Sequence, residues 1–205
     1  MKGNFMAQNQ TNNYNALFTT IAVAAFVGLA AAFVLSIEKI HLLMQPDAIL
    51  SCTVNLVLNC ATVMKTWQSS LFGFPNPFIG LMAYPVVITL AIGYLAGARY
   101  KPWFMVGAQI GALLGLIFAY WLFFQSVYVI EVLCPWCLFV TVVTTIIFDA
   151  FLRFNLLENT FNLSKNTHAK IIKLLKKDYD KLIVASWLVL MVVLVVVKFG
   201  KSLWG

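Results

Sequence analysis

The sequence contains few charged residues. Asp, Glu, Lys and Arg make up only 10% of its 205 residues, whereas 62% are hydrophobic. An ordinary soluble domain has about a quarter of its residues charged, so the composition excludes that class. Disordered chains are excluded as well, because they lack the aliphatic and aromatic residues that dominate here. We therefore expect a small integral membrane protein with no separate soluble domain.

Histidine and cysteine are also scarce, with two His and four Cys in the chain. A structural zinc site needs four converging ligands, usually as two closely spaced pairs. Cys134 and Cys137 form such a pair, but seven residues separate Cys52 from Cys60. We therefore expect no metal site, and the cysteines indicate disulfide chemistry instead.

Long apolar runs make up most of the chain. Each is long enough, or nearly so, to cross a hydrocarbon core of about 30 Å as a helix. The runs are 17–37, 78–98, 103–126, 133–151 and 182–197. They predict an all-α integral membrane protein, with a four-helix transmembrane bundle and a fifth transmembrane helix.

The same runs divide the chain into four parts. We expect a disordered N-terminus at 1–16, which is rich in Asn and Gln, and a four-helix bundle at 17–153. Within the bundle, the connection 38–77 is too apolar for a solvated loop, so it should fold as a short helical lid over the bundle mouth. A basic amphipathic linker at 154–181 leads to the fifth helix and a short tail at 182–205.

The positive charges predict an orientation. Ten of the 14 Lys and Arg residues fall in connections on one side of the membrane, and the other four are Lys39, Lys65, Lys198 and Lys201. By the positive-inside rule, the N-terminus and the basic linker are cytoplasmic and the four cysteines are external. The net charge of +7 therefore reflects topology. External cysteines suit disulfide chemistry, since disulfides persist in oxidising compartments.

Some residues inside the spans are expected to serve packing. Gly107, Gly111 and Gly115 are four residues apart, a spacing that lets helices approach closely. Asp149 and Arg153 are one helical turn apart, so we expect an ion pair on one helix face.

Two cysteines stand at the start of the fourth apolar run, as Cys134-Pro135-Trp136-Cys137. Cys134 can cap the helix, with Pro135 at its first position. The free N–H groups and the dipole of a helix start favour a thiolate. A reactive dithiol beside lipid can pass electrons between protein disulfides and a lipid-soluble carrier, and a static disulfide is the alternative.

The second pair, Cys52 and Cys60, lies in the expected lid. Thiol–disulfide exchange proceeds through mixed disulfides, so two pairs on one face of a membrane can form a relay. The lid pair would then take electrons from a soluble partner. A disulfide that only staples the loop is the alternative.

The two cysteine pairs, with the run Leu-Phe-Gly-Phe-Pro-Asn-Pro-Phe-Ile-Gly at 71–80 between them, resemble the vitamin K epoxide reductase family and most closely its bacterial members. The resemblance covers 17–153. It implies a four-helix bundle around a quinone, often with a fifth helix, in the inner membrane of a bacterial cell. The DsbB family of bacterial quinone-coupled thiol oxidases has its two pairs in the reverse order.

The resemblance also implies roles for the cysteines. Cys137 would reduce the quinone, Cys134 would exchange with Cys60 of the lid, and Cys52 would face the external partner. The partner would be a thioredoxin-like (DsbA-type) protein. Since the sequence ends at Gly205 without such a domain, we expect the partner to be a separate protein.

Three further residues match positions that contact the quinone in the family. Asn76 matches an asparagine that hydrogen-bonds a quinone oxygen, although an Asn between prolines also suits a turn. Thr66 stands where the family usually has Ser, and Ser69 and Ser70 are nearby substitutes. Thr141 stands where the animal enzymes have Tyr, so we do not extend the resemblance to vitamin K epoxide as a substrate.

Together these features predict a membrane thiol:quinone oxidoreductase that supports disulfide-bond formation. Electrons would pass from the partner through both cysteine pairs to menaquinone or ubiquinone. Two alternatives remain open: a reductase of the same family that runs on quinol, and a non-enzymatic membrane protein with two static disulfides.

Overall fold

The structure is a computed structural model that describes residues 2–53 and 57–204, and within these the side chains from residue 14 to residue 200. Its elements are almost all helical, which confirms the predicted all-α class with a helical lid. In chain order they are α1 (Lys2–Met44), α2 (Cys60–Lys65), η1 (Trp67–Ser70), α3 (Pro77–Leu95), α4 (Pro102–Phe124), η2 (Gln125–Ile130), α5 (Pro135–Leu157), α6 (Lys165–Leu175) and α7 (Tyr179–Trp204). The segments α2 and η1, together with the described residues between Met44 and Pro77, form the lid.

Five helical stretches of the described chain are long and apolar enough to cross a membrane, which confirms the five predicted spans. They are Tyr14–Met44, Pro77–Leu95, Pro102–Ile130, Pro135–Leu157 and Tyr179–Gly200. The protein is therefore a multi-pass membrane protein. Proline stands at the first position of α3, α4 and α5, where its missing N–H has no intrahelical partner to lose.

Helix α1 is longer at both ends than the sequence predicted. It begins at Lys2 and ends at Met44, so it includes most of the stretch 1–16, expected to be disordered, and the start of the expected lid at 38–77. A formed helix extends at low cost, because each added residue gains one hydrogen bond. One consequence is that Lys39, expected in a loop, lies on a membrane-spanning helix.

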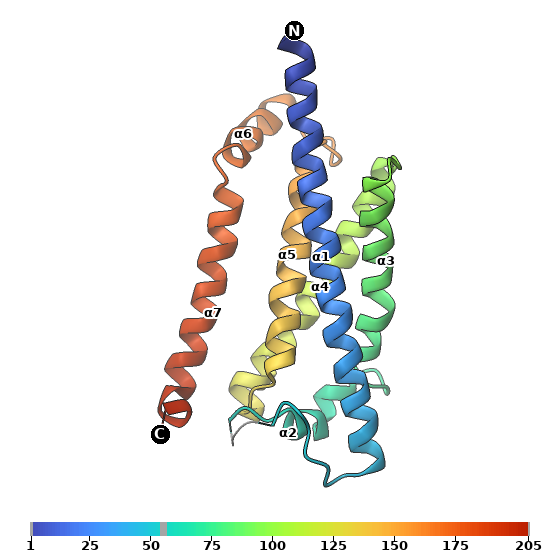
Figure 1. Cartoon of the computed structure of the whole chain (residues 1–205). Helices are drawn as coiled ribbons and strands as arrows, with labels where there is room; N and C mark the ends of the chain where they lie inside the picture. Colours follow the sequence, from blue (N-terminus) through green and yellow to red (C-terminus); the bar gives the residue numbers. More distant parts are fainter. Residues whose placement is uncertain (1, 54–56, 205) are drawn as a thin grey trace.

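The helices pack as a bundle in which α1 lies against α3 and α5, and α4 lies against α5 (Figure 1). The closest approach is between α1 and α3. A Cβ added to Gly28 would lie 2.5 Å from the ring of Tyr84, and one added to Gly80 would lie 2.8 Å from the Cβ of Ala32. These two glycines therefore set the distance between α1 and α3.

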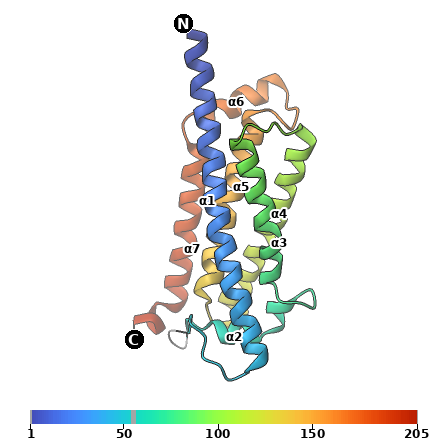
Figure 2. The same ribbon diagram turned by 45° about the vertical axis from the view of Figure 1, so that its right-hand side comes forward.

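The lid and the start of α5 lie at one end of the bundle, called the cysteine end below, and α6 and the N-terminus lie at the opposite end (Figures 1 and 2). The two termini of the chain are at opposite ends. Helix α7 lies beside the bundle and packs against α5 and α4.

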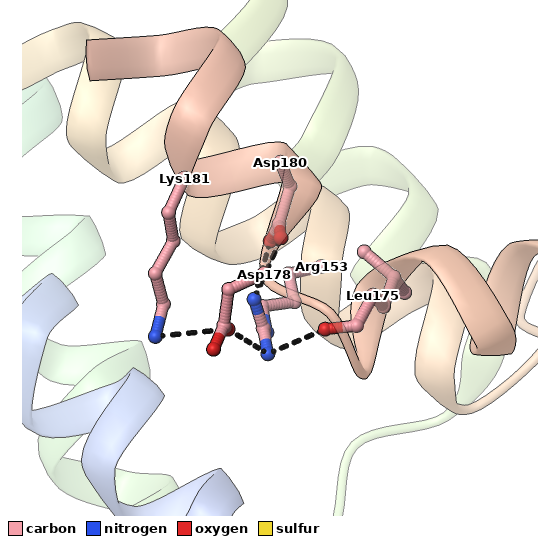
Figure 3. A network of polar contacts seen from close by, with 5 residues as sticks. All are labelled: Arg153, Leu175, Asp178, Asp180 and Lys181. Atoms are coloured by element: carbon pink, nitrogen blue, oxygen red, sulfur yellow. Dashed lines mark hydrogen bonds and ion pairs between the residues drawn. The ribbon is translucent and has the colours of Figure 1, made fainter.

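Charged contacts fix α7 at its first turn (Figure 3). The guanidinium of Arg153 on α5 donates to both carboxylate oxygens of Asp180, at 2.8 and 2.6 Å, and to the carbonyl of Leu175 at 3.1 Å. It also lies 2.9 Å from Asp178, which pairs with Lys181 at 3.1 Å. Hydrogen bonds from Lys181 and Arg153 lower the pKa of Asp178. The prediction that Arg153 pairs with Asp149 is wrong, because the carboxylates of α7 and its preceding turn reach the guanidinium instead.

The far end of α7 is fixed at the cysteine end. Lys198 donates to Glu131 at 2.7 Å, and this hydrogen bond lowers the pKa of Glu131. Halfway along, the indole N–H of Trp187 donates to the hydroxyl of Tyr120 on α4, at 2.8 Å. The fifth helix therefore has ion pairs at both ends and a hydrogen bond between them.

Replacing Arg153 by Met should lower the free energy of unfolding by about 1–3 kcal/mol, because the partly buried Asp180 loses its counter-charge. Thermal unfolding in detergent measures the loss, and faster proteolysis between α5 and α7 locates it. Lys181→Met is the matched control, since it removes only the exposed pair with Asp178. Equal stability of Arg153→Met and the parent protein would contradict this role.

Candidate functional site

Each cysteine pair has a member at a helix start. Cys60 is the first residue of α2, and the side-chain oxygen of Asn59 caps that helix by accepting the N–H of Thr62 at 3.1 Å. Cys134 caps α5, and its sulfur accepts the N–H of Cys137 at 3.4 Å. Cys52 and Cys60 form a disulfide, whereas Cys134 and Cys137 are free thiols.

A short backbone pairing joins the lid to the segment before α5. The N–H of Leu133 donates to the carbonyl of Val57 at 2.7 Å, and the N–H of Asn59 donates to the carbonyl of Leu133 at 3.0 Å. Since Asn59 and Leu133 each precede a cysteine, the pairing brings those cysteines together. The sulfur of Cys60 lies 3.2 Å from the sulfur of Cys134.

The meeting point of the two pairs is buried. Cys60 is 0% exposed and Cys134 is 1% exposed, so water and soluble thiols have no direct access to them. The pKa of the Cys134 thiol is lowered, chiefly by a hydrogen bond from Cys137 and further by backbone N–H groups of the first turn, although burial acts against this. Cys134 is therefore favoured as a thiolate next to the lid disulfide.

A cavity of about 660 Å³ lies inside the bundle, next to Cys134 and Cys137. Helices α1, α3, α4 and α5 and the lid form its walls, and most of its lining is apolar. The polar lining gathers toward the cysteine end and includes Lys39, Gln68, Ser69, Asn76, Gln125, Ser126, Thr141 and Thr144. A ligand with a polar head and an apolar body therefore fits this cavity with its head toward the cysteines.

The glycines of α4 line this cavity. A Cβ added to Gly107 or Gly111 would meet nothing within 4 Å, and one added to Gly115 would make an ordinary contact at 3.8 Å. The prediction that these glycines mediate close helix packing is therefore wrong. Val86 of α3, which is 59% exposed, also lines the cavity, so the space extends to the lipid-facing surface.

Asn76 both holds a turn and lines the cavity. Its side-chain nitrogen donates to the carbonyl of Gln68 at 2.7 Å, and its side-chain oxygen accepts the N–H of Leu71 at 3.1 Å. These bonds close the turn that leads into α3. An amide has two N–H donors and two acceptor positions, so Asn76 keeps hydrogen-bonding capacity for a ligand. The turn role and the ligand role are thus compatible.

The two predicted threonines differ in position. Thr141 lines the cavity, where its hydroxyl donates to the carbonyl of Cys137 at 3.0 Å. Thr66 is not among the lining residues, and its hydroxyl donates to the carbonyl of Val63 at 2.7 Å at the end of α2. Thr66 therefore stays a prediction without a position in the cavity wall. The nearby Ser69, considered as a substitute, does line the cavity.

Two features of the site were missed in the sequence. Gln68 donates to Gln125 at 3.3 Å, which ties the lid to the π-helical segment η2 across the cavity mouth. Lys39 is 7% exposed and lines the cavity. Lys39 stands four residues after Leu35 and three before Leu42. If the helix is continued through residue 44, this spacing places all three on one helix face, and that was the signal in the sequence.

One comparison with known proteins identifies a relationship. The sequence profile of the family described as the vitamin K epoxide reductase family matches residues 19–151. The matched range holds all four cysteines and the cavity walls, and it ends before α6 and α7. No curated protein matches the chain significantly.

The contact between Cys60 and Cys134 predicts a specific cross-link. A Cys52→Ser, Cys137→Ser variant keeps only these two cysteines, and a mild thiol oxidant should join them within minutes because their sulfurs already lie 3.2 Å apart. A Cys60→Ser, Cys134→Ser variant is the control, since the structure gives no sulfur contact between Cys52 and Cys137. Non-reducing mass spectrometry of peptides detects the bridge. Equal cross-linking of the two variants would contradict the arrangement.

The hydrogen bond from residue 137 predicts a pH effect on this cross-link. Cys134 has a lowered pKa, so we expect it to react first as the thiolate, and the rate then rises with pH through the pKa of that thiol. Loss of a hydrogen-bond donor to a thiolate raises the pKa of that thiol. The Cys52→Ser, Cys137→Ser variant keeps a hydroxyl donor at residue 137, whereas Cys52→Ser, Cys137→Ala has none. The midpoint of the pH–rate profile should therefore lie at higher pH in the alanine variant. Coincident pH profiles would show that residue 137 does not tune Cys134.

Proposed function

Because the chain belongs to the vitamin K epoxide reductase family, and so is a membrane oxidoreductase that works through cysteines, we propose that it is a thiol:quinone oxidoreductase. It oxidises a thioredoxin-like partner and passes the electrons to a membrane quinone, which supports disulfide-bond formation. The observation that carries this proposal is the 3.2 Å contact between Cys60, bonded to Cys52, and the free thiol of Cys134 beside the cavity.

The first part of the reaction brings electrons into the lid. The partner's dithiol reduces the Cys52–Cys60 disulfide and becomes a disulfide itself. The thiolate of Cys60 then attacks Cys134 of an oxidised Cys134–Cys137 pair, and Cys137 leaves as a thiolate. The mixed disulfide forms between the two sulfurs that lie 3.2 Å apart in the structure.

The second part restores the lid. Cys52 attacks Cys60, which re-forms the lid disulfide and releases Cys134 as a thiolate. The products are an oxidised lid and a reduced pair at the start of α5, the combination present in the structure.

The cavity supports the second half of the proposal. The family generally uses quinones, and the cavity has an apolar lining with polar groups near the dithiol, as a quinone ring requires. A bound quinone would accept two electrons and two protons as Cys134 and Cys137 close their disulfide. We propose that Cys137 is the thiol toward the quinone, and that Asn76 and Thr141, which line the cavity, hold its ring.

The alternative of two static disulfides is less well supported. The 3.2 Å contact between the sulfurs of Cys60 and Cys134 favours exchange between the pairs over two separate static bridges. A static lid disulfide would also not need a buried thiol next to it. The direction of electron flow, from thiol to quinone or the reverse, is set by the potentials of the two couples.

The proposed location follows from the distribution of positive charge. Ten Lys and Arg residues belong to the segments at the end of the bundle opposite the cysteines. We propose a bacterial inner membrane with that end in the cytoplasm and the cysteine end outside, where a separate thioredoxin-like partner can reach the lid.

Cys137→Ser should abolish quinone reduction, because no second thiol remains to release the electron pair. The assay follows loss of quinone absorbance with purified protein in lipid nanodiscs and a small dithiol as the donor. Ser70→Ala is the control, since Ser70 is not among the cavity-lining residues. Undiminished turnover by Cys137→Ser would overturn the proposed function.

A further inference from the structure

A positive charge is buried beside the redox site. Lys39 lies in the membrane span Tyr14–Met44 and is only 7% exposed. On the same face of α1, Leu35 and Leu42 pack into the cluster that contains three of the four cysteines. The Lys39 side chain therefore lies near the cysteine cluster, within a membrane helix.

The contacts of Lys39 leave its charge uncompensated. Its ammonium donates to the carbonyl of Met64 and to the hydroxyl of Ser69, the latter at 3.0 Å. Both acceptors are neutral, and within the described part of the chain no carboxylate pairs with it. An ammonium has three N–H donors, so these two bonds leave one. Burying such a charge costs several kcal/mol, and inside membranes charged groups mark functional sites.

The position of Lys39 indicates what its charge acts on. Lys39 lines the same cavity as Ser69, Asn76 and Cys137. A ligand there that accepts electrons from the dithiol gains negative charge on its oxygens. We propose that Lys39 donates a hydrogen bond to a ligand oxygen and stabilises that negative charge. This inference rests on the proposed function and names a group that acts on the quinone.

The electron and proton balance leaves Lys39 unchanged. The sulfur–sulfur bond between Cys134 and Cys137 forms, and the two electrons that the pair loses go to the quinone, which takes one proton from the Cys137 thiol and one from water, since Cys134 reacts as the thiolate. Lys39 remains protonated throughout, so it supplies charge and a hydrogen bond but no net proton. This is how preorganised donors stabilise charge that develops during a reaction.

A purely structural role for Lys39 makes a different prediction. Met64 lies in the last turn of α2, where a cation interacts favourably with the helix dipole. If Lys39 only clamps this helix, its loss would displace Cys60 from Cys134. If Lys39 acts on the ligand, its loss would change ligand binding and leave the cysteines in place.

Binding of two related quinones separates these roles. The first probe is 2-hydroxy-1,4-naphthoquinone, whose hydroxyl is ionised at neutral pH, and the second is the neutral 1,4-naphthoquinone. Quenching of tryptophan fluorescence measures their affinity for the full chain in nanodiscs. Lys39→Met should weaken binding of the anion by about 10- to 100-fold and that of the neutral quinone by less than about threefold. Lys39→Arg should keep the preference for the anion.

Two controls complete the experiment. Lys65→Met removes an exposed lysine from α2, the lid helix that Lys39 contacts. This variant should bind both quinones as the parent protein does. In the Cys52→Ser, Cys137→Ser background, Lys39→Met should leave the rate of Cys60–Cys134 cross-linking within about threefold.

The outcomes that overturn the inference are distinct. If Lys39→Met weakens binding of the anionic and the neutral quinone equally, Lys39 only clamps α2 and the inference is overturned. The same holds if Lys39→Met slows cross-linking by as large a factor as it weakens anion binding. Unchanged binding of the anion by Lys39→Met would overturn it while leaving the proposed function intact. Failure of the parent protein to bind either quinone would overturn both.

Discussion

The site depends on two backbone hydrogen bonds between the lid and Leu133. They place the first turn of α2 against the first turn of α5, so that Cys60 and Cys134 meet at 3.2 Å. Other contacts support this pairing. Met191 and Phe199 of α7 pack in the cluster that contains Val57 and Leu133, and Lys198 holds Glu131 just before it. The fifth helix, outside the family match, therefore stabilises the region where the two cysteine pairs meet.

The membrane determines how the polar groups of the site are arranged. In lipid, unsatisfied polar groups cost several kcal/mol each, so the lid satisfies its own through caps and turns, such as those of Asn59 and Asn76. The apolar cavity continues to the lipid-facing surface, whereas the polar groups stay near the cysteines. Under the proposed function, a lipid-soluble ligand meets the dithiol at this point, and the lid passes electrons to it from outside.

Much of this could be predicted from the sequence. Hydrophobic runs gave the five spans, and the cysteine spacing with the run 71–80 gave the family. The errors concern features that depend on three-dimensional contacts. Gly107 and Gly111 line a cavity instead of a helix contact, and Arg153 finds partners on α7 that are distant in sequence from it. Lys39 was missed because a charged residue after an apolar run suggests the end of a span, whereas α1 continues to Met44.

The central claim is that electrons move from the lid pair to the pair at the start of α5. The most direct test adds one equivalent of a dithiol to the fully oxidised protein without quinone, followed by acid quenching, alkylation and mass spectrometry. The account predicts that the two thiols appear on Cys134 and Cys137 while Cys52 and Cys60 remain bonded, and that added quinone removes the thiols. Thiols that remain on Cys52 and Cys60, or persist after quinone is added, would contradict it.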